Sequence, residues 1–360
     1  MKKKLTLFAL ATLISLPAHS QLFKIKITDF GNLDSSPALK AALEAEIAKA
    51  EADINKDLPS GDTRRLMEGM ADSSAIAGKG IGSDYASGME VFLIGAGVGV
   101  GADLEKDKQT DSDLSGVGVS PGIIIGANLG FMDAQKILGL ETNKLNIYLS
   151  GMSYGLDRKM GDGDKDQIEA DLTSLGFHVS YDWIKGSGSK LFGWGGVKLH
   201  TGYEYNSSKF SFTSTINEQI SAESGGITLS GNAVGKPNAE IEVTTHSIPI
   251  EISSSVQFLY ILSMYGGLGV DFNFGEAKGS GALNADETTL NCTGAGCGAI
   301  GTVKVQPSAN IDGNGKVTPM WGRAFLGLQI NLPYTRIFVQ ADKPVGNEVI
   351  GATAGLRFVY

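Results

Sequence analysis

The feature of this chain that most constrains its fold is an alternation of apolar and polar residues with a period of two, which recurs through residues 89–360. In the segment GVKLHTGYEY, Val197, Leu199 and Tyr203 fall on one face, whereas Lys198 and His200 fall on the other. Successive side chains of a strand point to opposite faces of its sheet. The pattern therefore predicts strands with an apolar environment on one side and a polar one on the other.

About ten segments carry this pattern. They span residues 89–103, 116–131, 144–157, 169–184, 193–213, 239–257, 263–276, 318–331, 336–343 and 347–360. Most reach or exceed the roughly 9 to 11 residues that a tilted strand needs to cross a bilayer. The chain also contains 49 glycines, which disfavours long packed helices. We therefore expect an all-β fold, a single antiparallel transmembrane β-barrel of about ten strands, over residues 89–360.

The connections between the predicted strands alternate in length. Those after the fifth and seventh strands, around residues 207–238 and 277–317, are long and polar, whereas those after the fourth, sixth and eighth are short. The longer connection FMDAQKILGLETN, after the second strand, breaks the rule. The alternation predicts loops at one end of the barrel and tight turns at the other, the periplasmic end, where we expect both the N-terminus and the C-terminus.

Aromatic residues collect near the predicted short-turn end. They are Phe131, Trp183, Phe192, Trp194, Phe258, Tyr260, Tyr334 and Tyr360. A girdle of this kind is typical of strands that meet a membrane interface. The alternative is that aromatic residues are simply common in strands.

The N-terminus is typical of a secretory signal peptide. Three lysines, Lys2 to Lys4, precede an apolar run from Leu5 to Leu16, and the small-residue sequence Ala18-His19-Ser20 follows. We expect residues 1–20 to be removed by cleavage after Ser20. No later stretch reaches the roughly 18 apolar residues of a spanning helix. No cysteine lies at the cleavage site to carry a lipid.

Charge disfavours nucleic acid as a partner. Without the three lysines of the signal peptide, 27 of the 30 basic side chains remain against 39 acidic ones, a formal charge of about −12. A nucleic-acid-binding surface needs clustered positive charge.

Residues 21–88 differ from the rest because their apolar residues recur at helical spacing. Ser36 and Pro37 are a suitable N-cap and first helical residue. The stripe that follows consists of Leu39, Leu43, Ile47, Ala50 and Ile54. A weaker helical pattern covers Thr63 to Ile76, and GKGIGSDYASG then reads as a flexible lead-in. Two interpretations remain: a small periplasmic extension, or a plug folded into the barrel lumen.

Two local motifs suggest a disulfide and a possible cation loop. Cys292 and Cys297, in CTGAGC, are close enough to form a loop-tip disulfide in an exported chain, and no further metal ligands lie nearby. The stretch DGDKDQIEAD has aspartates at calcium-loop spacing, but Gln167 stands where an EF-hand requires glycine. We therefore predict a solvated acidic loop and no metal site or cofactor.

The octet TAGLRFVY at residues 353–360 resembles the C-terminal signal of bacterial outer-membrane β-barrel proteins. Thr353, Gly355, Phe358 and Tyr360 match its polar, glycine, hydrophobic and terminal aromatic positions. The resemblance implies a Gram-negative outer-membrane location, contact with lipid and lipopolysaccharide, and recognition by the barrel assembly machinery. It identifies a superfamily and no subfamily, so function must come from the lumen and loops.

Charged residues on the inward faces are the candidates for a lumen site. By parity they are His178, Asp182, Lys198, His200, Glu204, Arg323, Arg336 and Arg357. Three interpretations are open: a charged constriction that filters solutes, a catalytic or metal site, or a network whose members neutralise one another. We predict no catalytic residue and no enzyme, because the candidates lie in mid-strand rather than at the loop end.

Ten strands enclose little more than their own side chains, so a wide pore is not expected. The charged lumen favours a narrow porin-like channel for small polar solutes. The long loops favour an alternative, a membrane-anchored, adhesin-like surface protein that binds host or cell-surface ligands.

Overall fold

The computed structural model describes residues 23–57, 63–86, 91–104, 116–132, 135–160, 166–188 and 191–360. The predicted signal peptide, residues 1–20, lies outside them. No described helix is long and apolar enough to cross a membrane.

Ten strands form a closed antiparallel ring. In ring order they are β2 (Phe92–Asp103), β3 (Gly116–Asn128), β6 (Leu145–Met160), β7 (Asp166–Gly188), β8 (Phe192–Thr213), β10 (Ile227–Phe258), β11 (Leu262–Ala285), β14 (Met320–Leu332), β15 (Thr335–Pro344) and β16 (Val349–Val359). Pairing of β16 with β2 completes the ring. Closure leaves the barrel without a free strand edge. The predicted fold class and each predicted strand are confirmed.

The end of the chain takes part in this closure. The Tyr360 amide donates to the Phe92 carbonyl over 2.9 Å, and the Phe92 amide donates to the Tyr360 carbonyl over 2.8 Å. The Tyr360 side chain is 79% exposed on the outside. Phe131 packs beside Phe92, and Phe192 beside Phe258, at the same end. The predicted aromatic girdle therefore surrounds the short-turn end, called the turn end below.

The outside of the barrel is apolar and the inside is polar. Exposed outward side chains include Ile94, Val98, Ile123, Ile125, Leu149, Leu175, Phe177, Ile250, Leu268, Leu326, Val339 and Ile350. Burial alternates along β14 and β15, and Arg323, Gln329, Arg336, Gln340 and Asp342 are on the buried side. This inversion is the architecture of outer-membrane β-barrel proteins, so the resemblance inferred from the terminal octet is confirmed.

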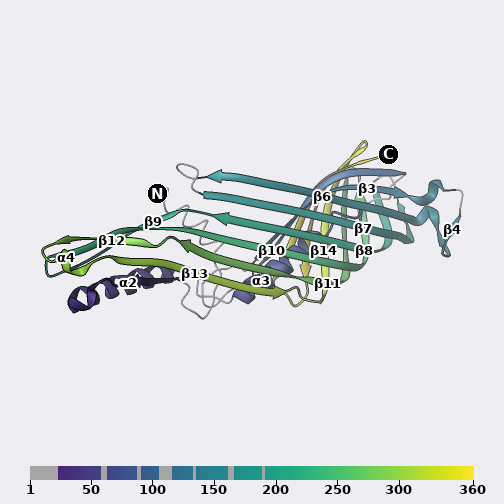
Figure 1. The fold of residues 1–360 in the computed structure, drawn as a ribbon. Helices are drawn as coiled ribbons and strands as arrows, with labels where there is room; N and C mark the ends of the chain where they lie inside the picture. The colour runs from purple at the N-terminus through teal and green to yellow at the C-terminus, as the bar shows by residue number, and fades with distance from the viewer. Residues whose placement is uncertain are drawn as a thin grey trace.

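Strands β10 and β11 continue far beyond the ring and carry an additional sheet, which extends to the left in Figure 1. There β10 pairs with β9 (Ile216–Ser224) and β12 (Thr288–Gly294), and β13 (Val303–Lys316) joins β11 to the edge strand β1 (Phe23–Asp29). We call this sheet, with residues 227–238 of β10 and 276–285 of β11, the arm. The stretches expected to be loops around residues 207–238 and 277–317 are therefore largely strands.

A long helix covers the arm sheet. Helix α2 (Pro37–Asp57) begins at the predicted proline, and its residues Leu39, Leu43 and Ile47 pack into a core cluster. The arm contributes Ile220, Ala222, Leu229, Leu283, Leu290, Ile300, Val303 and Val305 to that cluster. Cys292 and Cys297 form a disulfide at the far end, beside the short helix α4 (Cys297–Ile300). The part of the predicted stripe from Leu39 to Ala50 is thus packed against strands from much later in the sequence.

The N-terminal segment runs through the ring. Helix α3 (Thr63–Ala77) contacts β2, β3, β10, β11, β13 and β16, and residues 79–86 that follow are buried inside the barrel. Residues 78–86 of the stretch expected to be a flexible lead-in are therefore a packed lumen segment. We call residues 63–86 the plug.

The described chain ends lie at opposite ends of the barrel. Strand β1 is on the arm, whereas β2 begins and β16 ends at the turn end. The expectation that both termini share the turn end is therefore wrong for the N-terminal segment. It failed because the strand count places only the barrel's own first and last strands, and the segment before β2 crosses the lumen.

The connection between β3 and β6 has structure of its own. Two short 3-10 turns, η2 (Leu129–Phe131) and η3 (Thr142–Lys144), enclose a small hairpin of β4 (Lys136–Ile137) and β5 (Leu140–Glu141). This hairpin accounts for the one turn-end connection that is longer than the alternation predicts.

Candidate functional site: the filled lumen

Glycines on the inner wall make room for α3. A Cβ at Gly101 would collide with the carbonyl of Ser73 and the side chain of Ile76, and a Cβ at Gly118 would collide with the backbone of Ser73 and Ser74. The glycine-rich sequences of β2 and β3 therefore permit close approach of a helix backbone to the sheet.

The rim at the arm end holds α3 through hydrogen bonds to Asp72 of that helix. Its carboxylate accepts from the Thr318 amide at 2.6 Å, the Thr318 hydroxyl at 2.7 Å and the Asn347 amide group at 3.1 Å. Burial raises the pKa of the Asp72 carboxyl above its usual value, while these three hydrogen bonds act in the opposite direction. The helix is thus fixed to the mouth of the barrel at the arm end.

Below the helix, Lys79 from the plug lies among carboxylates of the wall. Its Nζ is 2.6 Å from Glu204 and 3.3 Å from Asp271, and it donates to the Ser247 hydroxyl over 2.7 Å. His178 Nε2 is 3.7 Å from the other oxygen of Glu204. The Lys79 side chain is fully buried. A buried cation of this kind requires such partners.

A second centre lies on the wall itself, around Arg323. Glu251 on β10 and Arg323 on β14 both pair in register with Gly269 on the intervening strand β11. Because glycine has no side chain, the guanidinium reaches across it to Glu251. Arg323 also binds Asp342 and, over 2.8 Å, Asp271, which accepts a further bond from Trp321 Nε1 over 2.8 Å.

Two arginines directly opposite each other form the third centre. Arg336 on β15 pairs in register with Arg357 on β16, an arrangement of like charges that is unfavourable by itself. The Asp84 carboxylate of the plug binds Arg336 and lies 3.6 Å from Arg357. Arg357 also donates to the carbonyls of Gly80 and Ser83. The wall therefore presents a cationic pair that an anion of the plug neutralises.

Tyr85 completes the plug with aromatic packing. Its ring is stacked on Tyr265 with centroids 5.6 Å apart, and it contacts His200 and Phe325 at 4.7 and 4.8 Å. Its hydroxyl donates to Glu251 over 2.8 Å. The plug is thus joined to the Arg323 centre as well.

The eight lumen residues predicted from parity all face inward, and all but Asp182 are buried. The structure brings Glu204 and His178 together around Lys79, and Arg336 and Arg357 around Asp84. Lys198 lies 3.8 Å from Asp182, and His200 Nε2 is 2.9 Å from the Ser253 hydroxyl. The candidates thus fall into several pairings rather than one constriction ring.

Sequence reasoning missed the partners that come from the plug. Lys79, Asp84 and Tyr85 lie in GKGIGSDYASG, where glycine and serine concealed their burial. Glu251 could have been found, because it alternates with the apolar Ile250 and Ile252.

Of the predicted assembly residues, Thr353 points inward and donates to the Lys79 carbonyl over 2.5 Å. Gly355 lies against the Phe338 ring, where a Cβ would collide. Phe358 and Tyr360 are exposed on the outside. Their recognition by the assembly machinery stays a prediction.

A small cavity lies between the plug and the wall. The cavity, of about 10 Å³, lies beside Gly78, Ile81, His178 and Glu204, which is room for roughly one water molecule. Among the described residues, no group of three or more His, Cys, Asp and Glu could hold a metal ion. In the acidic loop, residues 161–165 lie outside the described residues, and Asp166 accepts a hydrogen bond from Ser214.

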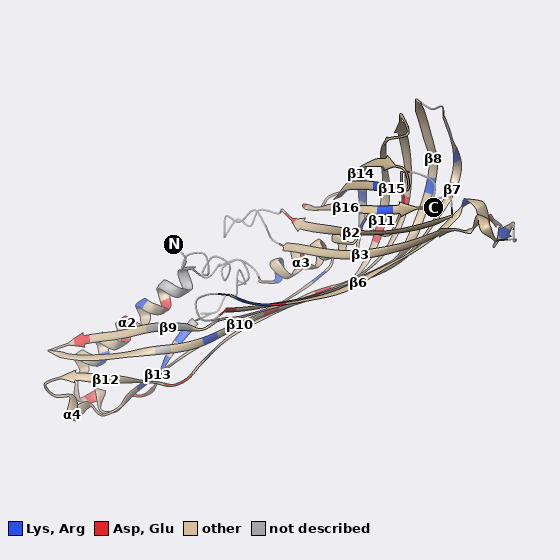
Figure 2. Cartoon of the chain, turned by 90° about the horizontal axis from the view of Figure 1, so that it is seen from above, with Lys and Arg blue, Asp and Glu red and all other residues tan. Residues whose placement is uncertain are grey.

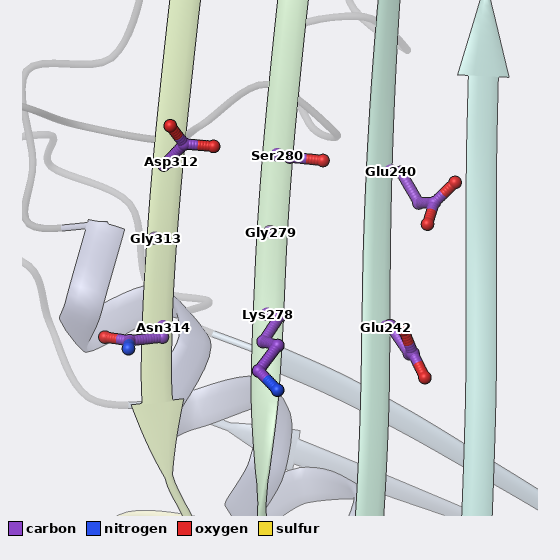
Figure 3. A pocket seen from close by; sticks show the side chains of 8 residues that line it. All are labelled: Glu240, Glu242, Lys278, Gly279, Ser280, Asp312, Gly313 and Asn314. Carbon is purple, nitrogen blue, oxygen red and sulfur yellow. The ribbon is translucent and has the colours of Figure 1, made fainter.

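The outer surface of the arm differs from the barrel exterior in being polar. Where β10, β11 and β13 leave the ring, an open hollow of about 530 Å³ is lined by Glu240, Glu242, Lys278, Ser280, Asp312 and Asn314 (Figure 3). Figure 2 shows charged residues along the arm strands and on α2. The apolar band therefore ends where the arm begins.

Comparisons with known proteins give one family and several distant structures. Residues 23–360 match the model of a family described as Lsa36-like. The comparison with curated proteins gives no match. Among solved structures, Acinetobacter baumannii CarO is 10% identical with a TM-score of 0.25, covering 61% of this chain and 96% of that chain. The translocator domain of autotransporter NalP from Neisseria meningitidis is 11% identical with a TM-score of 0.28, covering 92% and 99% respectively.

Proposed function

The chain belongs to the Lsa36-like family, and from that premise we propose that it is an outer-membrane surface protein whose plugged barrel anchors the arm outside the cell. The arm meets ligands, such as molecules of a host or of another cell surface, and the barrel holds it in place. This is the adhesin-like alternative that the long connections favoured.

The opposed pair Arg336 and Arg357 carries this proposal. An open aqueous channel would leave two arginines facing each other across neighbouring strands, whereas Asp84 of the same chain neutralises them. Lys79, in turn, neutralises Glu204. The wall is therefore complementary to the plug, and we assign the lumen charges a structural role rather than a catalytic one.

The orientation follows from the two ends of the barrel. Outer-membrane barrels have short turns on the periplasmic side and longer segments outside. The arm, with its polar surface, belongs in water, and the apolar exterior of the ring belongs in contact with lipid and lipopolysaccharide. We therefore assign the arm end to the cell exterior.

Planar-bilayer recording of the refolded full-length protein tests the proposal. We expect no steady channel events from a sample whose folded state is verified by its heat-modifiable migration in gels. Steady conductance of the native chain would overturn the anchor role. An Asp84→Lys variant, which places a third cation beside Arg336 and Arg357, should open the lumen, whereas Asp312→Lys on the exposed arm should stay silent.

A second candidate, a gated porin-like channel for small polar solutes, is favoured by one observation. Wall residues hold residues 79–84 of the plug largely through ion pairs and hydrogen bonds, which water can replace when the segment leaves. Release would expose Arg336 and Arg357 to the passage and so favour anions. Conductance that appears in the native protein only on a stimulus, with anion selectivity, would support this candidate.

A further inference from the structure

The path of the N-terminal segment spans the whole barrel. Strand β1 is paired with β13 on the arm, with Phe23 opposite Ala309. The chain then enters the ring as α3, fills the lumen as residues 78–86, and reaches the turn end, where Phe92 begins β2 beside Tyr360. One polypeptide thus connects the two rims through the inside of its own barrel.

The segment on the arm side did not pass the ring as a folded unit. The ring accommodates one helix, α3, against glycines of its wall. A helix is about 10–12 Å across, and α2 packed together with β1 is wider than that single helix. The apolar residues Leu39, Leu43 and Ile47 of α2 are buried against arm residues such as Leu229 and Val303. The folded form of this segment therefore requires the arm to be present.

The plug is fixed at the arm-side rim as well as in the lumen. Asp72 binds Thr318 and Asn347 there, and Gly313 on β13 lies so close to Thr63 that a Cβ would contact its side chain at 2.8 Å. These contacts define an end position for the segment after passage.

We propose that the barrel delivers its own N-terminal segment to the cell surface. Residues 23–57 traverse the ring in unfolded form and then fold onto the arm, while residues 63–86 remain behind and close the passage. The inference rests on the proposed function for the statement that the arm end faces outward. The inference adds to the anchoring role of the barrel the transport of its own N-terminal segment, which is then exposed at the cell surface.

Cysteine labelling of intact bacterial cells tests the inference. Lys26 on β1, Val345 in the arm-end turn between β15 and β16, and Lys136 in the turn-end hairpin are all exposed. Each is replaced singly by cysteine in the full chain. The two native cysteines form a disulfide and do not compete. With a membrane-impermeant maleimide, Lys26→Cys and Val345→Cys should label before lysis, and Lys136→Cys only after it.

The three variants separate the two ways of failing. If Val345→Cys labels in intact cells but Lys26→Cys labels only after lysis, self-translocation is overturned and the proposed orientation stands. If Lys136→Cys alone labels before lysis, the proposed orientation of the barrel is wrong, and the display of the N-terminal segment on the cell surface is overturned as well. Labelling of all three in lysed cells verifies that each thiol is reactive.

Discussion

At the scale of residues, ion pairs between the plug and the barrel wall hold the plug in the lumen. Lys79 and Asp84 of the plug face Glu204, Asp271, Arg336 and Arg357 of the wall. A buried ion pair contributes little net stability compared with apolar packing, but the loss of one member leaves an uncompensated buried charge. The network therefore penalises any register of the plug other than the observed one.

Lys79→Met tests this penalty. The substitution removes the cation beside Glu204 and should cost about 3–5 kcal/mol of barrel stability, the usual range for breaking a buried pair. The measurement is the urea midpoint of the heat-modifiable folded band. Lys209→Met is the matched control because Lys209 forms an exposed pair with Glu240, and it should leave the midpoint nearly unchanged. Equal midpoints for both variants would contradict the network.

Parity along the strands located the inward charges but could not pair them. Alternation fixes which face a residue such as Arg323 occupies, whereas its partners Glu251 and Asp342 depend on the stagger between strands. The plug residues were hidden for a different reason. Their sequence, GKGIGSDYASG, has neither the period of a helix nor that of a strand. Contacts with the wall determine the conformation of residues 78–86, so the sequence pattern alone does not indicate it.

At the scale of elements, the glycines of β2 and β3 leave room for the backbone of α3. Glycine weakens a strand by itself, yet Gly99, Gly101, Gly116 and Gly118 all face the backbone of residues 69–77. A glycine inside a strand can permit either barrel curvature or the close approach of another backbone. The structure gives the second, because an added Cβ at each would collide with the backbone of α3.

Gly101→Ala should therefore displace α3 from the wall. The added methyl group overlaps the Ser73 carbonyl and Ile76, so the helix must shift and expose Arg64 and Arg65 to trypsin more readily. Gly322→Ala is the control, since a Cβ there meets nothing within 4 Å. The measurement is the rate of tryptic cleavage within α3 in detergent-folded protein. Unchanged cleavage in Gly101→Ala would show that the close approach does not hold the helix.

At the scale of the whole molecule, the arm and the ring have separate interiors. The arm core consists of residues from α2, β1 and the sheet beyond the barrel, whereas the ring encloses the charged network and separate apolar clusters, one of which reaches Ala277 where β11 leaves the ring. The sequence predicted the ring because period two persists for ten strands. It could not predict the arm as a sheet, because those pairings join β1 to β13 across about 280 residues of chain.

Separate interiors predict separate unfolding. Leu43→Ala removes a fully buried side chain from the arm core and should destabilise the arm by about 2–5 kcal/mol without lowering the stability of the ring. Hydrogen exchange of α2 and β9 peptides should speed up while β14 to β16 stay protected. Leu138→Ala, at a position 99% exposed, is the control. Faster exchange throughout the barrel would contradict independent interiors.

The passage of the chain through its own ring also sets how the barrel can reopen. A plug that leaves its site stays covalently attached at both rims, through α2 on the arm and β2 at the turn end. Such tethering keeps a detached segment at a high effective concentration beside its binding site. Any open state is then brief, because the plug rebinds within the same molecule. Dilution therefore cannot favour the open state. Only a competitor that binds the wall, or a force that pulls on the arm, can prolong the open state.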